Sequence, residues 1–220
     1  AANADPNSLI GALAGIGAAT DLDPVGQVPH WLFAFDAAGM ATVRAAALLA
    51  ARPETQNHWE TSDPDVPQTR PYLRASVLES VRLWPTTPAL LRETVEGTTW
   101  RDGAERFTLG SGASLFICVP AFHRDSDTLP FADEFAPEIW LDGRAQRFPQ
   151  LVPFSAGPAE CPGRNLVLFV TSSMLAKLLD LLELKLLSHP QLSPGEPLPL
   201  TLNQFGLKFA VASRAVATRT

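Results

Sequence analysis

The sequence predicts a mainly α-helical fold with a small β portion. Two long apolar stretches, 30–52 and 164 to about 187, have the length and composition of buried helices. Between them, short apolar runs alternate with glycine-containing turns, which is typical of strands in a small sheet. By length, the 220 residues make one large domain or two small ones.

The composition excludes several classes of protein. The net charge is −6 and only 18% of the residues are charged, so the chain lacks the basic stripe of a general nucleic-acid binder. An apolar share of 46% excludes wholesale disorder. The two cysteines, Cys118 and Cys161, form no CxxC pair, which excludes a zinc ribbon and a thioredoxin-type dithiol.

The apolar stretches also predict where the protein resides. Residues 1–8 do not resemble a signal peptide, because no positive charge precedes an apolar run. The uninterrupted apolar stretches fall short of the roughly 18 residues that span a bilayer. We therefore expect a soluble, cytoplasmic protein with neither a membrane nor a nucleic acid among its partners.

Four helices are expected along the chain, beginning with a short one within 1–20. The most apolar helix follows over 30–52, and its composition predicts a central, buried position. Residues 54–69 read as a polar connector with a weak helix. A helix with one apolar stripe begins at Pro71 and runs to Trp84, and the last begins at Arg164.

Five short apolar runs are expected to be strands. They lie over 90–95, 106–109, 115–119, 198–202 and 207–211. The long segment 121–153 shows little periodicity and is expected to be a loop. Connections of this length without structure usually have a function.

The segment before the last long helix carries the clearest chemistry. It reads Phe154-Ser155-Ala156-Gly157-Pro158-Ala159-Glu160-Cys161-Pro162-Gly163, with the spacing F-x-x-G-x-x-x-C-x-G. A helix N-terminus carries a partial positive charge, which favours the thiolate that binds metals. The two glycines allow the backbone to approach a large, flat ligand. A buried structural cysteine is the alternative, and the full spacing argues against it.

This motif resembles the cysteine loop of the cytochrome P-450 superfamily of haem-thiolate monooxygenases. In that family the cysteine is the axial ligand of the haem iron, and its thiolate favours O–O cleavage. The resemblance implies that Cys161 ligates the iron of haem b (iron protoporphyrin IX). It also implies four further cofactor-binding residues in the loop: Pro153, Phe154, Gly157 and Gly163. The phenylalanine would pack near the sulfur, and the glycines would let the loop turn under the porphyrin.

Glu79 and Arg82 form a second motif, Glu79-Ser80-Val81-Arg82, on the helix expected over 71–84. At a spacing of three residues the two side chains can form an ion pair. They lie away from the apolar stripe of that helix, so the residues alone favour a solvated surface pair. The resemblance implies instead a buried ion network that braces the cysteine loop.

A third motif, Ala38-Gly39-Met40-Ala41-Thr42, lies in the helix 30–52. Small residues at 38 and 39 let a flat ligand lie against the helix, and the Thr42 hydroxyl can bond a carbonyl of the preceding turn. The resemblance implies that Thr42, with Ala38 and Gly39, lines the oxygen-binding groove and assists proton delivery to dioxygen. A core threonine bonded to its own backbone is the alternative.

Two further residues are singled out by their position. Arg92 lies ten residues beyond Arg82, where the family often places an arginine on a haem propionate, and a bidentate pair suits that carboxylate. A strand-surface arginine is the alternative. His123, in His123-Arg124-Asp125, could bind a metal or relay protons, although no partner spacing supports either role.

The resemblance covers only the C-terminal half of the family fold. We therefore expect 1–220 to be a single partial domain, the haem-binding half. It would supply the thiolate side of the haem site and one wall of the opposite side, and it would expose apolar surface of the helix 30–52. The chain is then a fragment, a sequence that lacks its N-terminal half, or one part of a two-chain assembly.

Three single residues depart from the family pattern. Ala41 stands where an acidic residue usually precedes the threonine, and Asp36 or water would have to substitute. Ile139 stands in place of the third arginine of the Glu–Arg network, which must therefore close otherwise. Ala159 stands where a basic residue usually meets a propionate, so more of that task would pass to Arg92.

The implied reaction is the insertion of one oxygen atom from O2 into an apolar small molecule. Electrons would come from a separate ferredoxin or flavoprotein, because the chain has no FMN or NAD motif. Arg144, Arg147 and Arg164 could meet an acidic donor, and a solvated surface is an equal interpretation. Two other functions stay open: a non-catalytic haem-binding remnant and a peroxide-driven oxygenase.

Overall fold

The computed structural model of the chain describes residues 5–16, 25–60 and 70–214. The chain divides into two compact units, Ala1–Met40 and Ala41–Thr220, which we describe separately. The boundary falls within the long helix α2, so this helix belongs partly to each unit.

The first unit contains α1 (Leu9–Ile16) and the first part of α2 (Gln27–Ala50). Ser8 caps α1, because its Oγ accepts a hydrogen bond from the backbone N–H of Gly11 at 3.0 Å. α2 begins and ends slightly before the expected 30–52. It is the one described helix that is long and apolar enough to cross a membrane, but the core helix of a soluble protein meets the same criterion.

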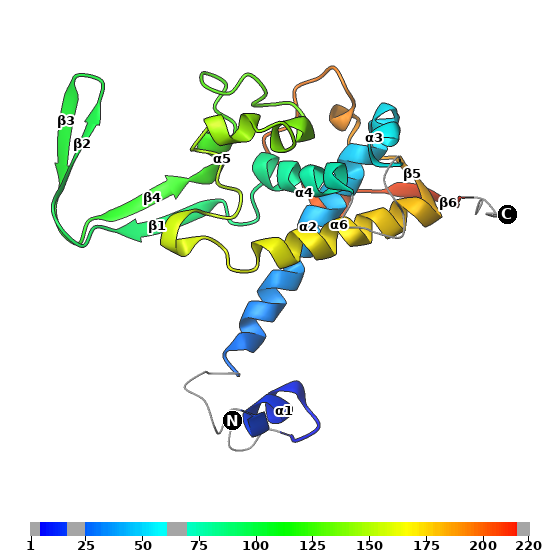
Figure 1. The fold of residues 1–220 in the computed structure, drawn as a ribbon, viewed down its shortest axis with the longest axis horizontal. Coiled ribbons are helices and arrows are strands. Elements are labelled where there is room, and N and C mark those ends of the chain that lie inside the picture. Colours follow the sequence, from blue (N-terminus) through cyan, green and yellow to red (C-terminus); the bar gives the residue numbers. More distant parts are fainter. Residues whose placement is uncertain (1–4, 17–24, 61–69, 215–220) are drawn as a thin grey trace. The chain divides into compact units, whose positions relative to one another are not determined.

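The second unit is built around the helices α4 (Pro71–Leu83) and α6 (Arg164–Leu181), which pack side by side against the second part of α2 (Figure 1). Their shared core consists largely of Ala45, Leu49, Leu73, Val77, Leu168 and Leu175. Arg70 precedes α4 and forms a bidentate ion pair with Asp180 near the end of α6, at 2.8 and 3.0 Å. The core and this ion pair therefore fix α4 against α6. α4 carries Glu79 and Arg82, and α6 begins directly after the segment that contains Cys161.

Short helical turns connect these elements. α3 (Gln56–Glu60) confirms the weak helix expected within 54–69, and α5 (Val119–His123) follows the fourth strand. The segment expected as a loop over 121–153 has no strand, and contains 3₁₀ turns at Pro137–Trp140 and Arg144–Arg147.

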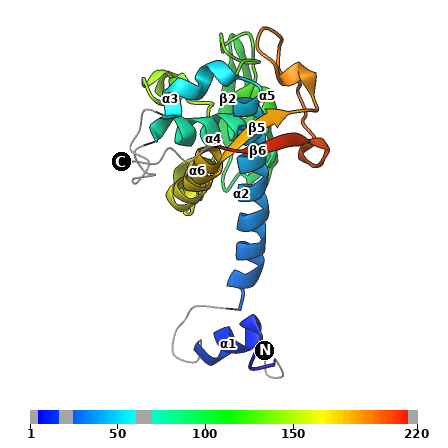
Figure 2. The same cartoon turned by 90° about the vertical axis from the view of Figure 1, so that its right-hand side faces the viewer.

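The β portion consists of three antiparallel pairs in the described part of the chain. The strands are β1 (Ala89–Glu93) with β4 (Ser114–Cys118), β2 (Thr98–Asp102) with β3 (Glu105–Leu109), and β5 (Leu182–Leu186) with β6 (Phe209–Ser213). The β2–β3 hairpin extends away from the helices (Figure 1). β5 follows α6 directly and lies beside β6 (Figure 2).

The mainly α fold with a small β portion is confirmed, and the structure differs from the expected elements in four places. Residues 98–102 form a strand that was not expected. α6 ends at Leu181 and not near 187, because 182–186 pair with β6. Residues 198–202 belong to no strand, and the final strand begins at Phe209 and not at 207.

Candidate functional site

Cys161 lies on a tight loop that ends at the first turn of α6. The backbone N–H of Cys161 donates to the carbonyl of Phe154 at 2.9 Å, which closes the loop. Two residues inside it have left-handed backbone, Ser155 with φ +61° and Gly157 with φ +64°. A non-glycine residue with positive φ is uncommon and tends to occur at functional sites. The loop is therefore a specific conformation that holds the cysteine before the helix.

The thiol of Cys161 is free and half-buried. A Cβ on Gly163 would lie 3.8 Å from its Sγ, which is ordinary contact. Gly163 has φ −83°, which any residue adopts, whereas Gly157 has φ +64°, in the left-handed region that favours glycine. Arg164 and Glu160 flank the thiol and pair with each other at 3.0 Å. Cys161 thus precedes the first residue of α6 by three positions.

Arg92 reaches this loop from strand β1. Its Nη2 donates to Ser155 Oγ at 3.2 Å, and its Nη1 donates to the carbonyl of Leu91 at 2.8 Å. The guanidinium is exposed at the edge of the loop. The structure therefore brings Arg92 and the Cys161 loop together across 63 positions of sequence.

Glu79 and Arg82 are fully buried, so the surface-pair alternative is wrong. Arg82 Nε and Nη2 donate to the two carboxylate oxygens of Glu79 at 2.8 and 2.7 Å. The remaining donors of the guanidinium reach four backbone carbonyls, those of His123, Phe131, Ala132 and Glu134. A buried ion pair is stable only when its remaining hydrogen-bonding groups are satisfied, and here every donor of Arg82 is used.

The network closes without a third arginine, as the substitution at Ile139 required. Trp140 Nε1 donates to one carboxylate oxygen of Glu79 at 2.9 Å, and the N–H of Ala136 donates to the other at 2.9 Å. Ile139 itself is fully buried in an apolar cluster. Trp140 was not predicted from the sequence to belong to this network. The adjacent departure at Ile139 was the one signal that a different donor was needed.

His123 also belongs to this region. Its Nε2 accepts a hydrogen bond from the N–H of Val152 at 2.9 Å, and its Nδ1 lies 3.2 Å from the carbonyl of Arg82. Burial is the main cause that lowers the pKa of His123 from 6.5 to about 4, so the ring is neutral near pH 7. With both nitrogens bonded, the ring offers no ligand to a metal, and no cluster of three metal-ligating side chains occurs in the described residues.

The residues of the third motif lie on α2, on both sides of the unit boundary. Thr42 is half-buried in the second unit, whereas Ala38 and Gly39 belong to the first. Ala41 is buried, and its carbonyl accepts a hydrogen bond from Ser80 Oγ at 3.0 Å. A carboxylate at position 41 would therefore enter an apolar cluster. Asp36, the substitute expected from the sequence, is exposed in the first unit.

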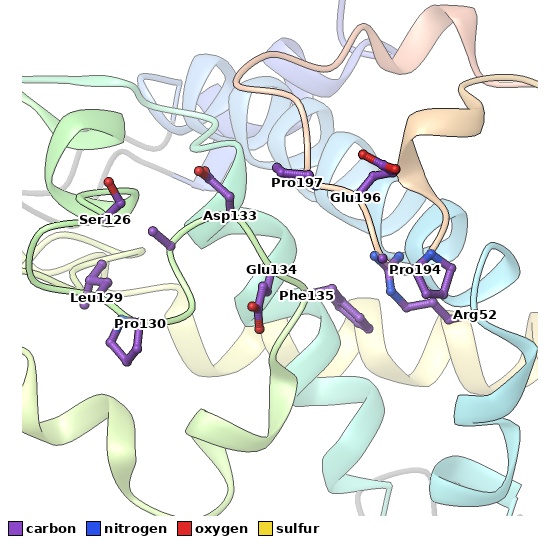
Figure 3. A pocket seen from close by; sticks show the side chains of 12 residues that line it. Arg52, Ser126, Leu129, Pro130, Asp133, Glu134, Phe135, Pro194, Glu196 and Pro197 are labelled. Atoms are coloured by element: carbon purple, nitrogen blue, oxygen red, sulfur yellow. The ribbon is translucent and has the colours of Figure 1, made fainter.

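Two cavities lie in the second unit. One of about 480 Å³ borders the Cys161 loop, whose residues 152–156 form one wall. The other, of about 500 Å³, is lined by Asp133, Glu134 and Glu196 with Arg52 at one side (Figure 3). No residue of the Cys161 loop lines this second cavity, so it is not part of the same site.

Comparison with known proteins agrees with this geometry. The family model described as Cytochrome P450 matches residues 55–209. The chain belongs to the cytochrome P450 family. The match includes the Glu79–Arg82 pair and the Cys161 loop, and it begins beyond Thr42. Membership implies a haem cofactor.

Individual relatives match over part of their length. "Probable cytochrome P450 4s3" of Drosophila melanogaster is 28% identical over 166 residues, which are 73% of this chain and 33% of the relative. "Putative cytochrome P450 cyp-13B1" of Caenorhabditis elegans is 33% identical over 171 residues, 71% of this chain and 32% of the relative. "Drimenol monooxygenase" of Persicaria hydropiper is 32% identical over 120 residues, 53% and 23%. The chain spans about a third or less of the curated relatives that it matches.

Proposed function

We propose that the protein is a haem-thiolate monooxygenase that inserts one oxygen atom from O2 into an apolar small molecule. The cofactor would be haem b, with Cys161 as the axial ligand of its iron. The observation that carries the proposal is the free, half-buried thiol at the N-terminal end of α6, held on a loop with left-handed backbone at Ser155 and Gly157.

The residues present fit such a cofactor. A thiolate at a helix N-terminus is a suitable ligand for haem iron, and the exposed guanidinium of Arg92 beside the loop suits a propionate carboxylate. Ala159 is exposed and offers no charge, so Arg92 would carry that interaction. Pro153, Phe154 and the two loop glycines would contact the porphyrin.

Bound haem supplies oxygen activation, and thiolate ligation favours cleavage of the O–O bond. The chain's own residues would bind and orient the haem and would exchange protons. Cys161 would hold the iron, and Arg92 would orient the porphyrin through a propionate. Thr42 would hold a proton on its hydroxyl on the oxygen side, with Ala38 and Gly39 on the same helix lining the oxygen groove. Since Ala41 provides no carboxylate, that proton would come from water or from Asp36.

The proposed partners follow from the same site. A ferredoxin or flavoprotein would supply electrons, and Arg144 and Arg147 are exposed on the turn before the Cys161 loop. α6 carries exposed apolar side chains, among them Leu166 and Met174. Together with the greater length of the relatives, they support the proposal that this chain is a single partial domain. A further segment or chain, the N-terminal half of the fold, would complete the site.

A non-catalytic haem-binding remnant is the second candidate, and Ala41 and Ala159 are the observations that favour it. Both positions lack the charged side chain that the resemblance leads us to expect. The closure of the Glu79 network by Trp140 argues against decay of the site. A peroxide-driven oxygenase is the third candidate, since it needs neither an electron donor nor an acidic residue beside Thr42.

The first test is the difference spectrum of the reduced, CO-bound protein after addition of haem. We expect a strongly red-shifted Soret band that a Cys161→Ser variant loses and a matched Cys118→Ser variant keeps. Uptake of haem with no such band in the parent chain would contradict thiolate ligation. No uptake would contradict haem binding by this chain alone.

Turnover then separates the three candidates. Product formed with O2 and a ferredoxin or flavoprotein donor supports the monooxygenase. Product formed with hydrogen peroxide alone supports the peroxide-driven oxygenase. Haem binding through Cys161 with no product under either condition supports the remnant.

A further inference from the structure

His123 connects the Glu79–Arg82 pair to the segment that leads into the Cys161 loop. The side chain is fully buried at the end of α5. A backbone N–H can only donate, so Nε2 must accept the bond from Val152 and carries no proton. The proton of the neutral ring is therefore on Nδ1, which donates to the carbonyl of Arg82.

The contact between His123 and Arg82 is reciprocal. Arg82 Nη1 donates to the carbonyl of His123 at 2.9 Å, while the His123 ring donates to the carbonyl of Arg82 at 3.2 Å. Two bonds in opposite directions therefore tie His123 to α4, one through its backbone carbonyl and one through its ring. The ring cannot shift without breaking its bond to the buried backbone carbonyl of Arg82, which is costly.

Backbone hydrogen bonds connect the residue bonded to His123 Nε2, Val152, to the Cys161 loop. The carbonyl of Val152 accepts from the N–H of Ser155 at 2.9 Å, and the carbonyl of Phe154 accepts from the N–H of Cys161 at 2.9 Å. The bond at His123 Nε2 thus anchors the first residue of a short hydrogen-bonded segment. That segment contains Ser155, whose positive φ needs support from its surroundings.

We propose that His123 is a positioning residue: its neutral ring fixes the Cys161 loop to the Glu79–Arg82 helix, and protonation of the ring releases Val152 and loosens the loop. A proton added at Nε2 would face the N–H that Val152 already donates, so the bond is lost. That this loop binds haem rests on the proposed function, whereas the connection through His123 does not.

The charged groups around the ring come from two elements. From α4, the hydrogen bond to the Arg82 carbonyl favours protonation, the charge of Arg82 opposes it and the charge of Glu79 favours it. From the chain beyond α5, Arg124 is adjacent and is paired with Asp133. Burial dominates over these charges and lowers the pKa of His123, so release is expected only in acid.

Two substitutions separate positioning from simple filling of space. His123→Gln keeps a carbonyl oxygen near the place of Nε2, so it still accepts from Val152 and does not titrate. His123→Asn keeps a donor near the place of Nδ1 but is too short to accept from Val152. Amide hydrogen exchange of Val152 measures the contact directly, and the amide of Trp84, which donates to Ser80 at 3.0 Å, reports α4 as a control.

At pH 7 and without haem, we expect His123→Asn to speed exchange at Val152 by about tenfold or more, with Trp84 unchanged, and His123→Gln to stay near the parent chain. As the pH falls below about 4, the parent should lose protection at Val152 before Trp84, and His123→Gln should not. Equal exchange at Val152 in the two variants would overturn the proposal. If neither variant folds, the parent chain alone still tests the proposal. Loss of protection from exchange at Val152 and Trp84 at the same pH would overturn it.

Thiol labelling gives a second readout at the cysteine itself. Cys118 is exposed on β4 and serves as an internal standard in the same chain. We expect His123→Asn to raise the labelling rate of Cys161 relative to Cys118 several-fold, and His123→Gln to leave it unchanged. An unchanged ratio in His123→Asn would overturn the link to the loop. Neither readout uses haem, so a failure of haem binding contradicts the proposed function and leaves this result standing.

Discussion

Trp140 donates its indole N–H to Glu79 across 2.9 Å, one residue after the buried Ile139. The carboxylate accepts four hydrogen bonds, two from Arg82, one from Trp140 and one from the N–H of Ala136. Four acceptor sites match the capacity of an ionised carboxylate. A neutral donor thus completes a buried ion pair where the family pattern led us to expect the third arginine of the network.

We expect Trp140→Phe to lower the free energy of unfolding by about 1–3 kcal/mol, because a hydrogen bond to a buried charge is lost while an aromatic, though smaller, ring is kept. Urea unfolding measures the change. Trp100→Phe is the matched control, since Trp100 is exposed on the β2–β3 hairpin and should change stability by less than about 0.5 kcal/mol. Equal effects of the two variants would mean that the indole contact contributes nothing.

Ile139→Arg is expected to destabilise the fold and not to improve the network. Ile139 is fully buried among Leu129, Phe131 and Ala145, and Glu79 has no free acceptor, so a new guanidinium would be buried without a partner. The expected loss is about 3–5 kcal/mol in urea unfolding. The control Ile139→Val should lose about 1 kcal/mol. A stable Ile139→Arg variant would show that the site has room for both donors.

The loop makes different demands on its two glycines. Gly157 has φ +64°, so Gly157→Ala should lower the free energy of unfolding by about 1–2 kcal/mol. Gly163 has φ −83° and space for a methyl group, so Gly163→Ala should stay within about 0.5 kcal/mol of the parent. Urea unfolding of both variants tests the pair, and a larger loss at 163 would contradict the backbone argument.

The buried His123 predicts a specific loss of stability in acid. Because burial lowers its pKa from 6.5 in water to about 4, the unfolded chain takes up the proton first as the pH falls. The stabilisation is complete above pH 6.5, declines by up to about 1.4 kcal/mol per pH unit below it, and is lost by about pH 4. Unfolding at pH 7.5 and 4.5 should show a smaller decline in His123→Gln than in the parent chain. Parallel declines would exclude His123 as their source.

The sequence predicted the helices well where they are long and apolar. The helix after Arg164 and the helix from Pro71 were located from periodicity and from the prolines that begin and end them. The end of α6 was misplaced because Leu182–Leu186 continues the apolar run, and only pairing with β6 shows that it is a strand. Residues 98–102 were missed because Trp100 and its neighbours lie on an exposed hairpin with no buried face.

The site was predicted less completely, for a physical reason. Cys161 and Arg92 could be identified from spacing and resemblance, and the structure brings their segments together. The partners of Glu79 lie 57 and 61 residues away, and the link from His123 to Val152 crosses 29 residues. Such contacts depend on how α4, α5 and the following turns pack, which no local pattern records. The resemblance implied that the Glu79–Arg82 pair is buried. The apolar stripe of that helix favoured an exposed pair, because both residues lie away from the stripe.

Arg92 provides the most direct test of how the chain orients a haem. Its guanidinium lies at the Cys161 loop and is exposed, so its removal should weaken a propionate contact without disturbing the core. We expect Arg92→Ala to weaken haem affinity about tenfold, the value of one hydrogen bond to a charged group. Arg101→Ala, on the exposed β2 strand, is the control and should bind haem as the parent does. Titration of haem by absorbance measures both affinities, and equal affinities would remove Arg92 from the proposed site while leaving Cys161 in it.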